Sequence, residues 1–384
     1  MKGRNDRQQN ERRQGNGATQ SSVPVATWFG GKMDCADTIW ERFGDVRGYV
    51  EPFAGSLAVL LNRPQPFGGT ETVNDLDGLL SNAWRAIRDN PDEVVYWADA
   101  PVSECDCHAE EIWLLNRKPD ITAQLEADIE WSDSRAAGYW LHGICCWIGS
   151  GFCDGKGPWQ VVDGKLIDTR QLPHLSNAGQ GVTRQLPHLG NAGQGVNRKR
   201  PHLSNAGHGV NRQLPHLSDA ELGGEPPATA RGAALREYMR QLSARLDRVR
   251  ICCGDWRRVC GGNKGDSLKH FFSGGNSCAV FLDPPYSAEA DRCNTLYAHE
   301  DLSAAHDVRE WAISQGHDER LRICLAGYDG EHNMPDDWEV VEWKTRGGYA
   351  SFADGETNGK DNCRRERLWF SPHCIRPAEE RLLF

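Results

Sequence analysis

The sequence predicts an α/β protein with a doubly wound parallel sheet, into which a long region is inserted. Two observations support this fold class. Short apolar runs of strand length alternate with helical stretches over residues 23–99, and the alternation resumes at about residue 246. A polar, repetitive segment lies between these two parts. Because alternating strands and helices are typical of parallel sheets covered by helices, 23–99 and 246–384 are predicted to form one domain.

In the first part, residues 48–53 predict a short buried strand, and the loop Ala54-Gly55-Ser56 opens a helix that continues to residue 61. A second strand is predicted over 70–75 and a helix over 79–88. In the second part, a helix rich in arginine over 228–250 precedes strands at 250–253 and 278–282. A helix at 301–314 and strands at 321–326, 338–343 and 366–371 complete the pattern.

Residues 100–245 form the predicted insertion. Segment 136–149 is rich in tryptophan, cysteine and glycine and predicts a buried helix. Residues 169–216 repeat with a period of 14, and Pro-His-Leu recurs in the copies. The repeats contain no acidic residue, so they form a basic strip suited to phosphate, with these six positive charges: Arg170, Arg184, Arg198, Lys199, Arg200 and Arg212.

The composition limits the class of protein. Residues 1–22 are polar and mildly basic, which predicts a disordered tail. No run of apolar residues reaches the length of a membrane span, and no secretory signal is present, so we expect a cytoplasmic protein. The net charge of −10 argues weakly against nucleic acid as a partner, although binding depends on where the charges lie.

The 14 cysteines do not follow the spacing of a known zinc motif, because no Cys-x-x-Cys pair occurs. The segment Cys105-Asp-Cys107-His108 is the one local cluster with ligand-like spacing. Ordinary reduced thiols are the simpler interpretation of it, so we predict no metal.

The tetrad Asp283, Pro284, Pro285 and Tyr286 follows a predicted buried strand, where ligands bind in open α/β sheets. An exocyclic amine of a base is a poor nucleophile, since its lone pair is delocalised into the ring. Hydrogen bonds to the Asp283 carboxylate and the Pro284 carbonyl would localise that lone pair. The two prolines fix the backbone, and Tyr286 offers a ring on which a flipped base can stack.

Four other loops are candidates for binding a cofactor. Glu51, Phe53, Ala54 and Gly55 belong to a small-residue loop after a strand, which allows close approach to a ligand. Asp75 follows the next strand and could bind ribose hydroxyls, with Asp77 as the alternate, although either acid could equally cap a helix. The third loop contributes Trp28 and Lys32. The fourth contributes Asp255, which is equally well explained as a turn aspartate.

Taken in order, the blocks F-G-G-K, E-P-F-A-G-S, N-D-L-D, G-D-W and D-P-P-Y resemble the Dam-like, alpha-group N6-adenine DNA methyltransferases over about 23–99 and 246–371. The resemblance implies a Rossmann-like S-adenosylmethionine methyltransferase core with a target-recognition region inserted at 100–245. The first loop would then bind S-adenosylmethionine, Asp75 its ribose, and Asp255 would lie near its adenine. Trp28 and Lys32 would line the pocket, and the tetrad would position the target base. The 14-residue repeats are not part of the family pattern.

The expected activity is therefore site-specific methylation of adenine N6 in double-stranded DNA, without a membrane or an obligate protein partner. The location expected is the cytoplasm of a bacterial or phage-type system. Two alternatives remain open at this point. The tetrad serves any exocyclic amine, so N4-cytosine or RNA could be the substrate, although Asp283 favours adenine. The second alternative is a catalytically silent DNA-binding protein with the same fold.

Overall fold

The computed structural model describes residues 32–147, 152–153, 159–162, 165–168, 228–261, 268, 271–272, 275–285, 304–343 and 366–377. The chain separates into two compact units. The first is Met1–Leu76, Ala244–Arg292 and Glu300–Phe384, and the second is Asp77–Ser243 with Cys293–His299.

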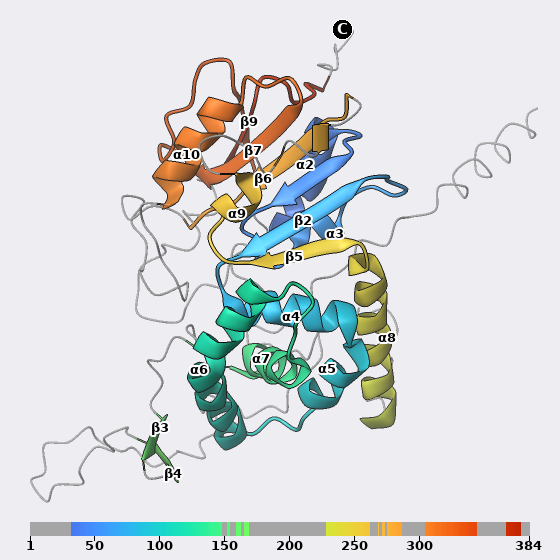
Figure 1. Ribbon diagram of the computed structural model, residues 1–384, viewed down its shortest axis with the longest axis vertical. Coiled ribbons are helices and arrows are strands. Elements are labelled where there is room, and N and C mark those ends of the chain that lie inside the picture. The colour runs from blue at the N-terminus through green and yellow to red at the C-terminus, as the bar shows by residue number, and fades with distance from the viewer. Residues whose placement is uncertain are drawn as a thin grey trace, which may run out of the picture. The chain divides into compact units, whose positions relative to one another are not determined.

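The first unit contains a seven-stranded sheet in the order β5-β2-β1-β6-β7-β9-β8 (Figure 1). Its first five strands are parallel, and β9 runs antiparallel to both β7 and β8. The mostly parallel α/β sheet confirms the predicted Rossmann-like fold class. The strands are β1 (Gly48–Glu51), β2 (Thr70–Asp75), β5 (Val249–Cys253), β6 (Cys278–Leu282), β7 (Leu321–Tyr328), β8 (Glu339–Glu342) and β9 (Glu366–Phe370).

Both faces of the central strands are buried, as expected for parallel strands covered by helices. On β1, Val50 belongs to a core that includes Val308 and Trp311 of helix α10 (Ala304–Gln315). Its neighbour Tyr49 points to the opposite face. There the centre of its ring lies 4.9 Å from the centre of the Trp40 ring on α2 (Ala36–Phe43). Consecutive residues of β1 therefore bury their side chains in different layers, because side chains alternate along a strand.

The order of the strands places a topological switch between β1 and β6. The chain passes from β1 to β2 and β5 on one side, then crosses to β6 and β7 on the other. The short elements of this unit are the 3-10 helix η1 (Lys32–Cys35) and the helices α3 (Ala58–Leu61) and α9 (Arg257–Cys260). Ligands bind at such a switch, beyond the carboxyl ends of the strands.

The second unit is helical. In it α7 packs against α4, α5 and α6, and β3 pairs with β4 in an antiparallel hairpin. Its elements are α4 (Gly78–Asp89), α5 (Pro91–Ala98), α6 (Glu104–Ala127), α7 (Ser134–Cys146), β3 (Trp159–Val162), β4 (Lys165–Asp168) and α8 (Ala228–Leu246), whose last residues fall in the first unit. The buried helix predicted over 136–149 is confirmed as α7.

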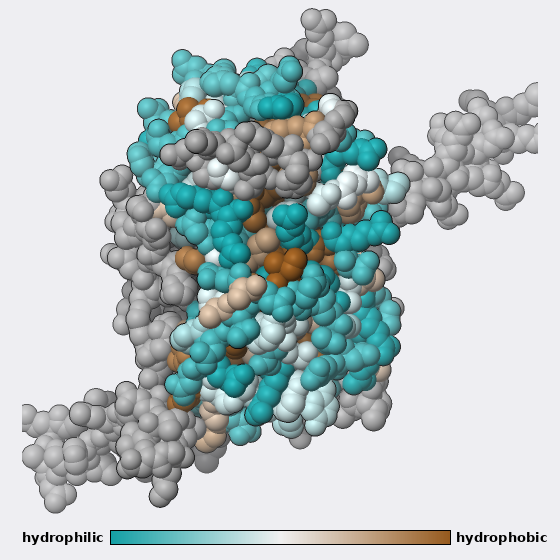
Figure 2. Space-filling model, viewed as in Figure 1, coloured by the Kyte–Doolittle hydropathy of each residue, from teal (hydrophilic) through white to brown (hydrophobic). Residues whose placement is uncertain are grey.

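The described surface in view in Figure 2 is mostly hydrophilic, with small and separate apolar areas. Within the described part of the chain, no helix is both long enough and apolar enough to cross a membrane.

Candidate active site

The switch between β1 and β6 is bordered by acidic side chains. Glu51 is the last residue of β1 and Asp283 directly follows β6, while Asp75 ends the neighbouring strand β2. Because these three strands are adjacent and parallel, the carboxylates reach the same edge of the sheet. The structure therefore assembles three of the residues that the sequence singles out.

Asp283 is held by a buried lysine. The Lys32 Nζ atom lies 3.1 Å from the Asp283 Oδ1 atom and 3.5 Å from the Glu366 Oε2 atom. The side chain of Lys32 is 5% exposed and that of Glu366 is 7% exposed, whereas the side chain of Asp283 is 23% exposed. The ammonium also lies 5.8 Å from the centre of the Trp343 ring. Asp283 is thus the accessible member of a fixed, charged cluster.

This arrangement suits a hydrogen-bond acceptor. Lys32 attracts and orients the Asp283 carboxylate, and the buried Pro284 and half-buried Pro285 restrict the backbone after it. A carboxylate fixed in this way can accept a hydrogen bond from a donor without first having to reorganise.

Sequence reasoning missed Glu366. It lies at the start of β9, which pairs antiparallel with β7. Strand β7 in turn lies next to β6, the strand that Asp283 follows. No local motif marks it, since an acid at the beginning of a strand is common on a surface. The antiparallel strand brings Glu366 to the lysine.

Glu51 is buried at the carboxyl end of β1, and 2% of its surface is exposed. Its carboxylate accepts a hydrogen bond of 2.9 Å from the Tyr49 hydroxyl. Burial raises the pKa of Glu51 to about 8, and the charge of Asp283 contributes in the same direction. Glu51 is therefore mostly protonated at pH 7, and a neutral carboxyl can donate a hydrogen bond as well as accept one.

The loop after β1 is fastened to the neighbouring strands. The Asn74 side-chain amide donates to the carbonyls of Pro52 at 3.1 Å and Gly254 at 2.8 Å. The backbone N–H of Ala54 donates to the Asn74 carbonyl at 2.9 Å, and Phe53 is half-buried. These bonds join the ends of β1, β2 and β5 into one rigid group, formed by residues 52–55, 74–75 and 254–256, which we call the cradle.

Gly55 has a φ of 47°, which lies in the left-handed region, and its N–H donates to the Asp75 Oδ2 atom at 3.0 Å. The φ explains the preference for glycine at this point of the turn. The bond also fixes the Asp75 carboxylate at the rim of the cradle.

The two acids after β2 have different roles. The Asp77 Oδ1 atom accepts from the backbone N–H of Leu79 at 2.9 Å, which makes Asp77 the N-cap of α4. Of the two, Asp75 is the acid that remains a candidate for a ligand.

Asp255 is exposed and makes a turn at the start of α9. It accepts from the backbone N–H of Arg257 at 2.8 Å and from its guanidinium at 3.2 Å. The buried ring of Trp256 lies 6.4 Å from that of Phe53, so two aromatic residues line this part of the cradle. The turn explains Asp255 structurally and leaves its carboxylate at the surface.

Several predicted site residues lie outside the described residues. They are Trp28, Tyr286 and the six basic residues of the repeats, Arg170, Arg184, Arg198, Lys199, Arg200 and Arg212.

The residues of the cradle fit a nucleoside ligand. Asp75 supplies an acceptor for ribose hydroxyls, and Phe53 and Trp256 supply apolar ring surface. Among the described residues, the Asn74 Oδ1 and Trp256 Nε1 atoms are buried without a hydrogen-bond partner. Polar atoms in such a position call for an explanation, and a bound ligand is one.

The family model of D12 class N6 adenine-specific DNA methyltransferases matches residues 28–119. The match begins at Trp28 and includes Lys32, the loop after β1 and the acids after β2, and it ends before Asp255 and Asp283. No curated protein matches the chain in sequence.

Proposed function

We propose that this protein is a DNA methyltransferase that transfers a methyl group from S-adenosylmethionine to N6 of adenine. The family match supports methylation of adenine N6 in DNA. The observation that carries the proposal is Asp283, an accessible carboxylate fixed by buried Lys32 at the switch point of the sheet. The family match does not reach Asp283, so the match and the geometry are separate lines of support.

The loop after β1 and the ends of β2 and β5 would hold S-adenosylmethionine. We assign its ribose to Asp75 and its adenine to the surroundings of Asp255, with Phe53, Ala54 and Gly55 close to it. We also assign Glu51, the last residue of β1, to the cofactor site, where its protonated carboxyl can donate a hydrogen bond. When bound, the cofactor supplies an electrophilic methyl group on a sulfonium.

Asp283 and the Pro284 carbonyl would accept hydrogen bonds from the amino group of the target adenine. These bonds draw electron density back onto the nitrogen, which makes it a better nucleophile. Lys32 keeps the carboxylate in place. Positioning and preorganised electrostatics are then sufficient, and no cysteine nucleophile is needed.

We further propose that the substrate is double-stranded DNA, from which the target base is flipped out to stack on Tyr286. The Dam-like, alpha-group arrangement places target recognition in 100–245, and the basic repeats would contact phosphates there. The sequence predicts this role for the repeats from six positive charges without an acid.

The test is methyl transfer from labelled S-adenosylmethionine to DNA, followed by nucleoside analysis. We expect N6-methyladenine, and we expect Asp283→Ala to lower the rate by at least about 100-fold, as for removal of one preorganised polar group. The matched control is Asp336→Ala, which removes an exposed acid of the same unit and should keep the rate.

Other products would contradict the proposal. Methylated cytosine or methylated RNA would move the substrate to another amine. Binding of DNA without binding of S-adenosylmethionine would identify a silent DNA-binding protein. A normal rate for Asp283→Ala would remove that residue from the mechanism.

A further inference from the structure

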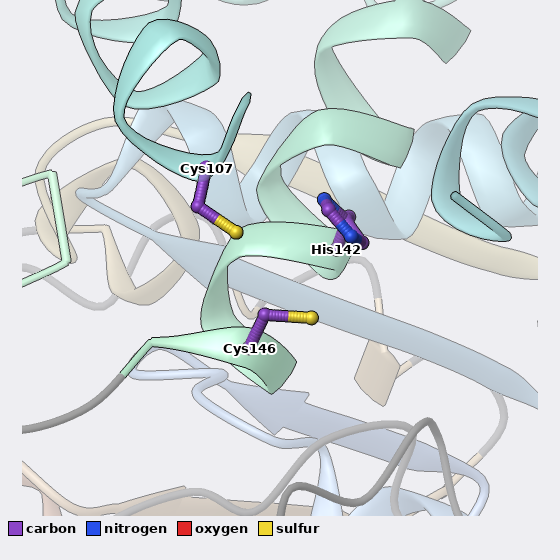
Figure 3. A group of neighbouring side chains, drawn as sticks. All are labelled: Cys107, His142 and Cys146. Atoms are coloured by element: carbon purple, nitrogen blue, oxygen red, sulfur yellow. The ribbon is translucent and has the colours of Figure 1, made fainter. Parts of the chain in front are cut away.

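Two cysteines and a histidine meet in the interior of the helical unit. Cys107 comes from α6, and His142 and Cys146 come from α7 (Figure 3). The two sulfur atoms and one ring nitrogen all lie within 4.8 Å of one another, and all three residues are buried. The three side chains therefore point toward one position from two packed helices.

The helices explain why the three side chains converge. His142 and Cys146 are four residues apart on α7, so they lie on the same face of that helix. On α6, Cys107 and Glu110 are three residues apart and share a face in the same way. The packing of α6 on α7 then brings the two faces together.

The histidine has the hydrogen-bond pattern of a metal ligand. Its Nδ1 atom is 2.7 Å from the Glu110 Oε2 atom, and its side chain is fully buried. Its Nε2 atom is buried without a hydrogen-bond partner. When Nδ1–H of a neutral histidine donates a hydrogen bond to a carboxylate, the lone pair lies on Nε2, and this pattern is common among histidines that bind metals.

The atoms also suit one class of metal. For zinc bonds of about 2.3 Å to sulfur and 2.0–2.1 Å to nitrogen, tetrahedral ligands are separated by roughly 3.5–3.8 Å. The three atoms within 4.8 Å need only a small contraction to reach that geometry. Two thiolates balance the charge of a divalent ion, which favours binding in a buried position.

Packing alone explains the cluster less well. The two thiols can satisfy one another, but a buried Nε2 without a partner costs about 1–3 kcal/mol. A metal ion would use that lone pair. We propose that Cys107, His142 and Cys146 bind a zinc ion that joins α6 to α7 through three protein ligands, with Glu110 positioning the histidine.

This site is not visible from local spacing. Of the segment Cys105-Asp-Cys107-His108, only Cys107 takes part, because Cys105 is exposed and His108 pairs with Glu111 at 3.4 Å. The ligands from α7 follow 35 and 39 residues later in the sequence. The expectation of no metal rested on local motifs, which this arrangement does not contain.

The first experiment measures zinc in the full-length protein, purified without added metal, by elemental analysis. We expect about one zinc per chain, and after exchange with cobalt we expect the visible and near-ultraviolet absorption of a thiolate-bound tetrahedral ion. Cys146→Ala and His142→Gln should lose at least nine tenths of the bound metal.

The matched controls are Cys145→Ala and Cys105→Ala. Each removes a thiol one or two residues from a proposed ligand in the sequence but outside the cluster, so each should keep the metal. Glu110→Gln should retain the cobalt spectrum but weaken metal binding by ~10–100-fold, which a purely structural role in packing would not produce.

Three results would overturn the proposal. The first is a wild-type chain that binds neither zinc nor cobalt when either ion is supplied. The second is equal loss of metal in Cys145→Ala and Cys146→Ala. The third is a Cys107–Cys146 disulfide found by mass spectrometry in protein kept under reducing conditions. Metal content is measured on the wild-type chain, and variants are compared only when their circular dichroism matches that of the wild type, so a variant that fails to fold does not decide the outcome. Methyl transfer is not part of this test, so its result is independent of the proposed activity.

Discussion

Lys32 places a buried ammonium between two carboxylates at the edge of the sheet. The Asp283 and Glu366 oxygens lie 3.1 and 3.5 Å from its Nζ atom. Two acids this close to one point would repel each other without the lysine, since buried charges are weakly screened. At the scale of single residues, Lys32 therefore contributes to stability and to the orientation of Asp283.

Replacing Lys32 tests both contributions. Lys32→Met should destabilise the protein by about 3 kcal/mol, because it leaves the buried Glu366 carboxylate and the partly exposed Asp283 carboxylate without a counter-charge. The double variant Lys32→Met/Glu366→Gln should recover at least half of that loss. Both can be measured by urea unfolding, and an unchanged free energy of unfolding in Lys32→Met would show that the cluster contributes nothing to stability.

Glu51 predicts a pH dependence of stability. Its pKa is raised from an ordinary value of 4.5 to about 8 in the folded protein. Between these values the folded state holds a proton that the unfolded state has released. Stability from this group is thus complete below pH 4.5 and falls as the pH rises toward 8, by at most about 1.4 kcal/mol per pH unit.

Glu51→Gln should remove this slope, so that the free energy of unfolding changes less between pH 5 and 8 than in the wild type. Glu41→Gln, which alters an exposed acid on α2, is the control and should keep the wild-type slope. Identical slopes for Glu51→Gln and the wild type would show that Glu51 has an ordinary pKa.

At the scale of elements, the strands and the longer helices follow from patterns in the sequence. The predicted strand over 70–75 coincides with β2, and the strand over 278–282 coincides with β6. The segment 278–282 is apolar and short, so burial within a sheet is the structure that satisfies both its side chains and its backbone. Helix α6 was not predicted, because it carries a weakly amphipathic sequence and contains Pro119.

The acids that follow β2 allow a test at this scale. Asp77→Ala should cost about 1 kcal/mol of stability, because it removes the N-cap of α4, and should leave the affinity for S-adenosylmethionine within about twofold. Asp75→Ala should do the reverse and weaken cofactor binding much more than stability. Calorimetric binding and thermal unfolding of both variants measure this, and equal losses of affinity would contradict the division of roles.

At the scale of the whole molecule, the charges of the chain are unevenly distributed along the sequence. The net charge is −10, yet residues 169–216 contain six basic residues and no acid. DNA attracts local positive charge, so an acidic protein can still bind it through one basic region.

The repeats can be tested through the salt dependence of DNA binding. If all four side chains contact phosphates, replacing Arg170, Arg184, Arg198 and Arg212 with glutamine should reduce the slope of log K against log salt by about 0.9 for each lost contact. Fluorescence anisotropy at several salt concentrations gives both slopes. A slope equal to that of the wild type would exclude the repeats from the interface.

The α/β class, most of the strands and the places of Asp75 and Asp283 at strand ends can be predicted from the sequence alone. These features follow from local periodicity and from short motifs at strand ends, which depend on neighbouring residues. The tertiary structure decided which distant residues meet. Glu366 reaches Lys32 through an antiparallel strand, and His142 reaches Cys107 through the packing of two helices. Contacts of this kind depend on how elements pair and pack, and local sequence patterns carry little information about that.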